Sequence, residues 1–385
     1  MEPNTDRDID LVIVTGAGAS QAFGNPNLPT GLGTSTMPLM KDWSDSLVKK
    51  LDTSGIGSGL VGLSNNLTGL EFENRLGHFL RVVSIFPELE SILEPSAKWD
   101  PSGLELGRLQ SWHTNTNRRL KDAITIIRES LYENFGWERT LPSAATEAYR
   151  RLLEALSTSS SQRVVYATTN YDRIGEAALD RIGRRTDCGE RSHYAPPGYG
   201  PELVFDPEGL LGGMPRFTPV LHLHGAVGWY RRPGQEAIYV AGGGAYSEDQ
   251  GIPVVMLPDP NKDYDADRVI QTIWTEFRQA LRRAKKVLVL GHSLNDGSLV
   301  RALVDEVTPT ERIAVTLLSS EHDPDEVDES ATSTMNIARE HLPNVPSILL
   351  RFDPNCRPPE THIRKWDALL EGALKAERAV RKEDN

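Results

Sequence analysis

The chain has 385 residues, of which 38% are apolar and 25% charged, enough for one large globular domain or two ordinary ones. Its 42 Lys and Arg against 54 Asp and Glu give a net charge of -12, which disfavours direct nucleic-acid binding. Two cysteines, Cys188 and Cys356, exclude a disulfide framework and a four-cysteine zinc site. With a polar N-terminus and no long apolar run, we expect a soluble, cytoplasmic protein without a signal peptide or membrane span.

The first predicted strand covers residues 11–14 (LVIV), where apolar residues without polar alternation indicate a strand buried on both faces. Gly16 and Gly18 then open a turn that lets a ligand approach the backbone, and a helix starting near Ser20 would favour an anion. Gln21 stands where the G-x-G-x-x-G fingerprint has its third glycine, so an ordinary dehydrogenase matches poorly. A purely structural turn is the alternative.

About 150 residues separate this strand from the next, far more than a strand-helix-strand crossover needs. Helical spacing of apolar residues in this gap predicts a mainly helical insert over residues 34–160, packed over the ligand edge of the sheet. A Pro-, Gly- and Arg-rich stretch, 183–218, is expected to be irregular and to form a lid. One amphipathic helix is predicted within 356–385.

Further short apolar runs follow, most of them ending in Gly, Ser, Thr or Asn, and helical patterns lie between them. They cover residues 163–170, 219–225, 285–293, 313–320 and 347–352. Alternating strands and helices predict an α/β fold with a doubly wound, Rossmann-like parallel sheet. Residues 1–33 and 161–355 would form this nucleotide-binding domain.

Polar and small residues cluster at the ends of these predicted strands. They are Gly16, Ala17, Gly18 and Ser20; Thr169, Asn170 and Asp172; His222, His224 and Gly225; Gly291, Ser293, Asn295 and Asp296; and Ser319 and Ser320. Because ligands bind beyond the carboxyl ends of parallel strands, we expect these sets to meet in space.

Each set also has an ordinary structural explanation. Asn170 and Asp172 could cap a helix that begins near Arg173. His224 could be a core histidine whose ring is satisfied by a backbone carbonyl. Ser293 and Asp296 could likewise cap the helix predicted over residues 298–304.

The combination of GAG-x-S, T-x-N-x-D, HG and G-x-S, in this order after successive strands, resembles the sirtuin fold family. It resembles more closely the sirtuin-like NAD-cleaving effectors of bacterial anti-phage defence. The resemblance covers the strand ends from Thr15 to Ser320, in fragments, and does not include the predicted helical insert.

The resemblance implies roles for the strand-end residues. Asn170 would position a water or a ribose hydroxyl, Asp172 would bind the nicotinamide carboxamide, and His224 would be the catalytic base. The implied NAD-binding residues are Gly16, Ala17, Gly18 and Ser20 around the pyrophosphate, Gly291 and Ser293 at phosphate and ribose, Ser319 on the adenosine side, and Thr169 and Asp296.

Two departures from the deacylases of that family narrow the expected activity. Their zinc module has two C-x-x-C pairs, which this chain lacks, and the sequence after the first glycine turn also differs. We therefore expect no zinc and no acyl-lysine peptide as co-substrate. The predicted reaction is hydrolysis of NAD to nicotinamide and ADP-ribose, which would deplete NAD in defence against phage.

This chemistry is compatible with the predicted residues. Nicotinamide leaves as a neutral molecule and needs no acid, whereas the oxocarbenium-like ribose needs an oriented acceptor and a base that titrates near neutral pH. His222 and His224 are two positions apart, so strand alternation predicts that both lie on one face. We select His224 as the base because Gly225 follows it.

Other functions remain open at this point. The chain could bind NAD or ADP-ribose as a sensor without turnover, or act as a sirtuin-type protein deacylase or ADP-ribosyltransferase. A nuclease is disfavoured by the net charge. Because a free NAD hydrolase would harm its host, we expect control by homo-oligomerisation or by a separate partner, and the family resemblance suggests a HerA-like hexameric ATPase.

Overall fold

A computed structural model describes a large part of the chain. The described residues are 8–16, 40–64, 72, 75–76, 78–79, 104–135, 150, 153–154, 161–193, 202–214, 216–232, 236–240, 252–255, 268–292, 294, 296–307, 313–319 and 347–351.

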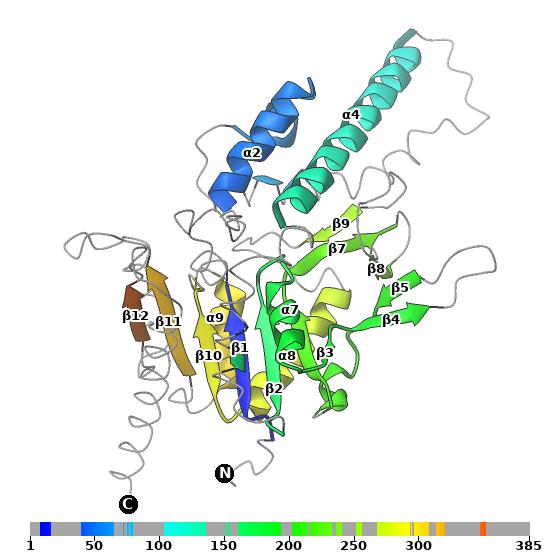
Figure 1. Cartoon of the computed structure of the whole chain (residues 1–385). Coiled ribbons are helices and arrows are strands. Elements are labelled where there is room, and N and C mark those ends of the chain that lie inside the picture. Colours follow the sequence, from blue (N-terminus) through cyan, green and yellow to red (C-terminus); the bar gives the residue numbers. More distant parts are fainter. Residues whose placement is uncertain are drawn as a thin grey trace, which may run out of the picture.

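The centre of the molecule is a parallel sheet of seven strands (Figure 1). Its strands are β1 (Leu11–Thr15), β2 (Val164–Thr168), β3 (Thr186–Asp187), β6 (Thr218–His222), β10 (Val287–Leu290), β11 (Ile313–Ser319) and β12 (Ser347–Arg351). They are arranged in the order β12-β11-β10-β1-β2-β6-β3, and every neighbouring pair is parallel. The predicted α/β class with a parallel sheet is confirmed.

Helices cover both faces of this sheet, which explains why its central strands are apolar throughout. All residues of β1, β2, β6 and β10 are buried. Alternate residues of β1 enter different cores: Ile13 joins the one that contains α7 (Ile174–Arg181), and Val12 joins the other. Helices α8 (Arg268–Arg283) and α9 (Gly297–Glu306) pack in that second core. The sheet is therefore doubly wound, as predicted.

A separate antiparallel sheet stands beside the parallel one. It contains β4 (Glu190–His193), β5 (Glu202–Phe205), β7 (Gly225–Arg231), β8 (Ile238–Val240) and β9 (Ile252–Val255), in the order β4-β5-β8-β7-β9. The expectation of an irregular stretch over 183–218 is corrected, because β3, β4, β5 and the short helix η2 (Leu210–Gly213) lie within it. These strands were missed because each is only two to four residues long and carries too few positions to show a period.

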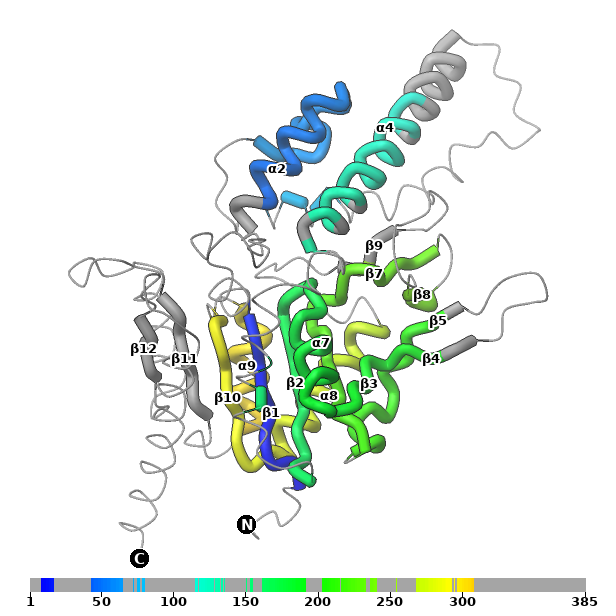
Figure 2. The backbone as a smooth tube through the Cα atoms, viewed as in Figure 1, coloured from blue at the N-terminus to red at the C-terminus, as the bar shows by residue number. Residues whose placement is uncertain are grey.

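The described part of 34–160 is helical and contains α2 (Met40–Thr53), η1 (Ser58–Val61) and α4 (Leu104–Phe135). Figure 2 shows α2 and α4 beyond one end of the parallel sheet, and the arrows in Figure 1 show that its strands run toward this end. The indole nitrogen of Trp43 donates to Ser130 Oγ at 3.0 Å, which joins the two helices in a buried contact.

The proposed domain boundaries remain predictions, and the helix expected in 356–385 lies outside the described residues. Among the described helices, none combines the length and apolar character needed to cross a bilayer.

Candidate functional site

The site begins where the chain leaves β1 and β10, the two strands between which the strand order reverses. The backbone N–H of Gly16 donates to the carbonyl of Leu290 at 3.0 Å. A Cβ at Gly16 would lie 2.8 Å from both the carbonyl oxygen of Gly291 and Cα of His292. Only glycine fits this approach of two backbones, and the place is the one where doubly wound sheets bind ligands.

The exit of β2 is tied directly to the exit of β1. The Asn170 side chain is buried, and its Nδ2 donates to the carbonyl of Gly16 at 3.2 Å. A second contact between these two strand ends is the hydrogen bond that the backbone N–H of Thr169 donates to the Thr15 carbonyl at 3.0 Å. The Asn170 side chain therefore makes a contact across strands, whereas the ordinary explanation expects it to cap a helix.

Asp172 does serve the following helix. Its Oδ1 accepts from the backbone N–H of Ile174 at 3.0 Å, in the first turn of α7. Between Asn170 and Asp172, the ring of Tyr171 packs edge to face on Phe135, the last residue of α4, with centroids 5.8 Å apart. The end of the long helix thus packs directly behind the β2 exit.

His224 lies beyond the end of β6, in a tight turn that leads from the parallel sheet into β7. The turn closes on Gly225 with φ at 79°, a conformation that favours glycine and explains the His-Gly pair. His224 Nε2 lies 2.8 Å from Oδ2 of Asp296, and both side chains are buried. This ring therefore pairs with a carboxylate, whereas the ordinary explanation for a core histidine requires only a backbone carbonyl.

Asp296 also caps α9. Its Oδ1 accepts from the backbone N–H groups of Ser298 at 3.0 Å and Leu299 at 3.3 Å. The ordinary explanation for Asp296, a helix cap, therefore holds, and the contact with His224 is additional to it. The expected role of Asp296 in NAD binding stays a prediction.

His222 and His224 do not face the same helices, which corrects the expectation from strand alternation. Nε2 of His222 lies 2.7 Å from Oε1 of Glu176 on α7, whereas His224 meets the residue that begins α9. Alternation fails here because β6 ends at His222 and the chain turns immediately afterwards.

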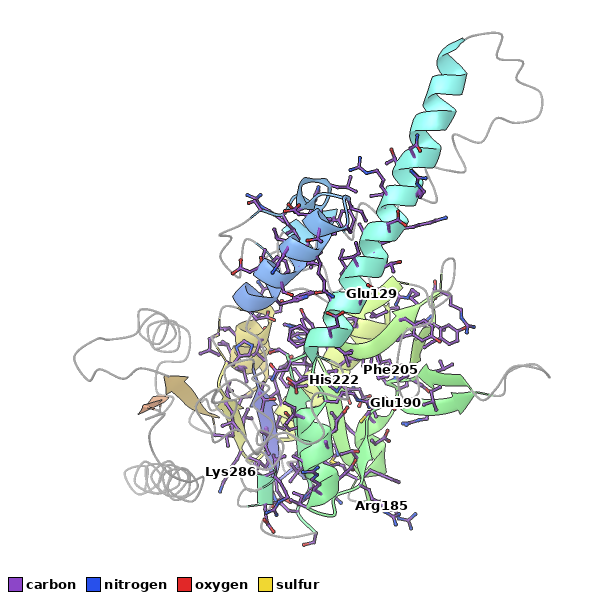
Figure 3. All side chains as sticks on the ribbon, turned by 45° about the horizontal axis from the view of Figure 1, so that its top comes forward. Glu129, Arg185, Glu190, Phe205, His222 and Lys286 are labelled. Atoms are coloured by element: carbon purple, nitrogen blue, oxygen red, sulfur yellow. The ribbon has the colours of Figure 1, made fainter. Side chains whose placement is uncertain are left out.

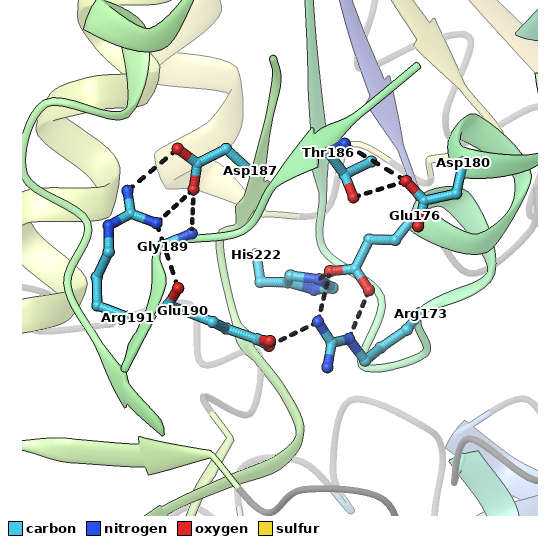
Figure 4. Close-up of polar contacts among 9 residues, drawn as sticks. All are labelled: Arg173, Glu176, Asp180, Thr186, Asp187, Gly189, Glu190, Arg191 and His222. Carbon is cyan, nitrogen blue, oxygen red and sulfur yellow. Dashed lines mark hydrogen bonds and ion pairs between the residues drawn. The ribbon is translucent and has the colours of Figure 1, made fainter. Parts of the chain in front are cut away.

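Glu176 is the centre of a buried ionic network that the sequence analysis missed (Figure 4). Arg173 Nε donates to Glu176 Oε2 at 2.5 Å, and Arg173 Nη2 lies 2.6 Å from Oε1 of Glu190 on β4. Burial alone would raise the pKa of Glu176, but attraction to Arg173 and His222, together with their hydrogen bonds, holds it at about 2. The network joins α7 and β6 to the antiparallel sheet, and Figure 3 shows His222 near the centre of the view and Glu190 beside the strands of that sheet.

The thiol of Cys188 lies next to this network and is not reactive. Burial raises the pKa of its thiol well above the ordinary value, and the nearby Glu176 raises it further. The thiol is therefore protonated at neutral pH. Among the described residues, no group of three or more His, Cys, Asp or Glu is arranged to hold a metal ion.

The four strand exits form a closed circuit. Gly16 contacts Gly291, and Asn170 bonds Gly16. The backbone N–H of Leu223, the residue before His224, donates to the carbonyl of Thr168 at 2.9 Å. His224 then reaches Asp296, which follows β10 in sequence. The structure thus brings the exits of β10, β1, β2 and β6 together.

Several predicted residues are not placed by this geometry. Ala17, Gly18, Ser20 and Ser293 lie outside the described residues, and Ser319 is described only as the last backbone position of β11. Their roles remain predictions. His292, which the sequence analysis passed over, is buried beside Gly16, and its Nδ1 accepts from the backbone N–H of Leu294 at 2.9 Å.

Comparisons with known proteins reveal a similarity to a solved structure. No protein-family model matches the chain, and no curated protein matches it. Among solved structures, the chain is similar to a Sir2 homolog in complex with NAD, with 11% sequence identity and a TM-score of 0.39. The match covers 95% of this chain and 90% of that one. A TM-score this low does not transfer the site or the activity of that protein to this chain.

Proposed function

We propose that this protein is an NAD glycohydrolase that converts NAD and water to nicotinamide and ADP-ribose. The single observation that carries the proposal is the closed circuit of contacts among the exits of β10, β1, β2 and β6. It gathers an amide, Asn170, and a carboxylate-paired imidazole, His224, from residues that are far apart in sequence. The choice of NAD as the substrate rests on the motif resemblance to sirtuin-like NAD-cleaving effectors.

The pyrophosphate of NAD would lie at the switch point between β1 and β10. The close approach of Gly16 to Gly291 places backbone groups, with the His292 ring beside them, at the edge where dinucleotides bind to doubly wound sheets. The nicotinamide ribose would then extend along the sheet edge toward Asn170 and His224. In this orientation, Asp172 would accept from the carboxamide of the nicotinamide.

In the reaction, the bond between ribose C1′ and the pyridinium nitrogen breaks, and its electron pair leaves with neutral nicotinamide. A water oxygen bonds to C1′ and gives its proton to His224, acting as a general base. The amide of Asn170 would position this water or a ribose hydroxyl, so its contribution is orientation rather than proton transfer. No acid is needed, because nicotinamide leaves uncharged.

The biological context rests on the motif resemblance alone. We propose that NAD depletion serves anti-phage defence and that activity depends on self-assembly or on a separate partner, with a HerA-like ATPase as the candidate. The assembly is tested by measuring NAD cleavage per chain over a dilution series while light scattering reports the mass. Specific activity should fall as assemblies dissociate, and full activity in a dilute monomer would exclude this form of control.

The activity itself is tested by incubating purified protein with NAD and quantifying nicotinamide and ADP-ribose by chromatography. Equal amounts of both products should form without an acyl-peptide or DNA. Asn170→Ala and His224→Ala should each lower the rate by about 10²-fold or more. His78→Ala, which alters an exposed histidine on another part of the chain, is the matched control and should retain full activity.

Three outcomes would count against the proposal. Product formation that requires acyl-peptide would indicate a deacylase, and binding of ADP-ribose without any NAD consumption would indicate a sensor. Wild-type turnover in the His224→Ala variant would show that the imidazole is not needed for the reaction.

A further inference from the structure

We infer that Asp296 is a positioning residue that fixes the tautomer of His224, so that Nδ1 is the nitrogen that accepts the proton. This inference rests on the proposed NAD hydrolysis for its catalytic meaning. It goes further by assigning the proton-accepting atom and by giving Asp296 a role other than contact with NAD.

The geometry of the pair determines which ring nitrogen carries hydrogen. Nε2 of His224 lies 2.8 Å from Oδ2 of Asp296 in the interior, where the exposed fractions of the two residues are 3% and 9%. An ionised carboxylate can only accept, so Nε2 must donate. In a neutral imidazole one nitrogen donates and the other accepts. The lone pair is therefore on Nδ1.

Asp296 is itself held ionised and in one orientation by α9. Its other oxygen, Oδ1, accepts from the N–H groups of Ser298 and Leu299, and hydrogen bonds to a carboxylate favour its charged form. The positive end of the ten-residue helix acts in the same direction. Rotation of the carboxylate away from His224 would break the helix cap, so Oδ2 stays directed at the ring.

The backbone around His224 is fixed independently of Asp296. The N–H of Leu223 donates to Thr168 on β2, and its carbonyl accepts from the indole nitrogen of Trp274 on α8 at 3.2 Å. On the other side, Gly225 holds the left-handed conformation that begins β7. The imidazole thus lies between two rigid elements. This arrangement, a base oriented by a third group, is the one that general-base catalysis requires.

The proton balance of the step follows from this assignment. When water attacks C1′ and nicotinamide departs with the bonding pair, Nδ1 takes the water proton and the ring becomes an imidazolium. Asp296 keeps its own charge and stabilises the cation through Nε2–H. The proton is later released from Nδ1 to solvent, which restores the starting tautomer.

The variant that separates positioning from structure is Asp296→Asn. Asparagine is a good helix cap, so its Oδ1 can keep the bonds to Ser298 and Leu299. Its Nδ2, however, can only donate to His224 Nε2, which forces the ring hydrogen onto Nδ1 and removes the base. We expect kcat to fall on the order of 10³-fold or more, while KM for NAD and the affinity for ADP-ribose change by about twofold or less.

Asp52→Asn is the matched control. Asp52, in the last turn of α2, accepts from the N–H of Ser58 at 2.7 Å at an exposed position, so the same chemical change is made in an aspartate whose described partner is a backbone N–H. Its kcat should equal that of the wild type. Thermal unfolding of Asp296→Asn should also stay close to that of the wild type, because the cap of α9 is retained.

The tautomer is read directly from long-range ¹H–¹⁵N spectra of protein labelled with ¹⁵N-histidine, with His224 identified by its loss in His224→Ala. The wild type should show the Nε2–H form and Asp296→Asn the Nδ1–H form. An Nδ1–H tautomer in the wild type, or unchanged kcat in Asp296→Asn, would overturn the inference. If the wild type does not hydrolyse NAD, the proposed function fails, but the spectra still decide the tautomer assignment.

Discussion

Nε2 of His222 and Oε1 of Glu176 lie 2.7 Å apart in the interior. His222 is two residues before His224 in the sequence, and Glu176 is four residues after Asp172. This contact holds the exit of β6 against α7, while Arg173 extends it to Glu190 on the antiparallel sheet. The two segments that carry the candidate catalytic side chains are thereby fixed to each other by charge as well as by packing.

Replacement of Glu176 by Gln should destabilise the protein strongly. The Glu176 carboxylate is buried and pairs with the partly buried Arg173 guanidinium, and breaking a buried ion pair costs about 3–5 kcal/mol. Denaturant unfolding measures the difference. The control is Glu133→Gln, which breaks a more exposed ion pair with Lys50 and should cost about 1 kcal/mol or less. Equal losses in the two variants would contradict the buried network.

The same carboxylate predicts how stability depends on pH. Its pKa is about 2 in the folded protein against an ordinary 4.5, so the unfolded chain binds the proton first as the pH falls. The contribution of Glu176 is complete above about pH 4.5 and is lost between about 4.5 and 2.

Other carboxylates with lowered pKa, Asp8, Asp10 and Glu306, titrate in both proteins, so the difference between wild type and Glu176→Gln is the relevant measurement. The free energy of unfolding should fall more steeply with acid in the wild type over this range. Parallel curves for the two proteins would show that Glu176 does not carry the effect.

Replacement of Gly16 by Ala should disrupt the site. The new Cβ would lie 2.8 Å from backbone atoms of Gly291 and His292, which cannot move aside as a flexible side chain can. We expect about 1–3 kcal/mol of destabilisation and a loss of ADP-ribose binding by calorimetry. Gly59→Ala serves as the control, because nothing lies within 4 Å of its added Cβ. Unchanged ADP-ribose affinity in Gly16→Ala would show that the switch point between β1 and β10 is not part of the binding site.

The contact between Phe135 and Tyr171 predicts that the end of α4 supports catalysis. Phe135→Leu keeps most of the buried volume but loses the edge-to-face ring contact behind Asn170. The cost in stability should be about 1.5 kcal/mol or less, whereas kcat for NAD should fall several-fold because Asn170 is less well positioned. Phe79→Leu, at a buried position in the helical part of the chain before α4, is the control and should alter stability without a comparable loss of kcat. Equal kcat losses in both variants would argue against a specific support.

Much of the sheet could be predicted from the sequence because its central strands are buried on both faces and therefore uniformly apolar, as in residues 11–14 and 287–290. The rule that ligands collect at carboxyl ends then identified the residues that follow those strands. It led to Gly16, Asn170 and His224, which the structure brings into one circuit of contacts.

The pairings within the site could not be predicted in the same way. His224 and Asp296 are 72 residues apart, and the sequence around Asp296 is fully explained by the helix cap that it also forms. Glu176 lies in a short helix rich in small apolar residues, and nothing local indicates that it faces inward to His222. Such contacts depend on the packing of whole layers, which a local pattern does not encode.

The most direct test of the central claim is a crystal structure of Asn170→Ala with NAD bound. The dinucleotide should span the exits of the central strands, with its pyrophosphate against the edge formed by Gly16 and Gly291 and its nicotinamide ribose beside His224. NAD bound at another surface, or packed side chains filling the space between these residues, would contradict the proposed site.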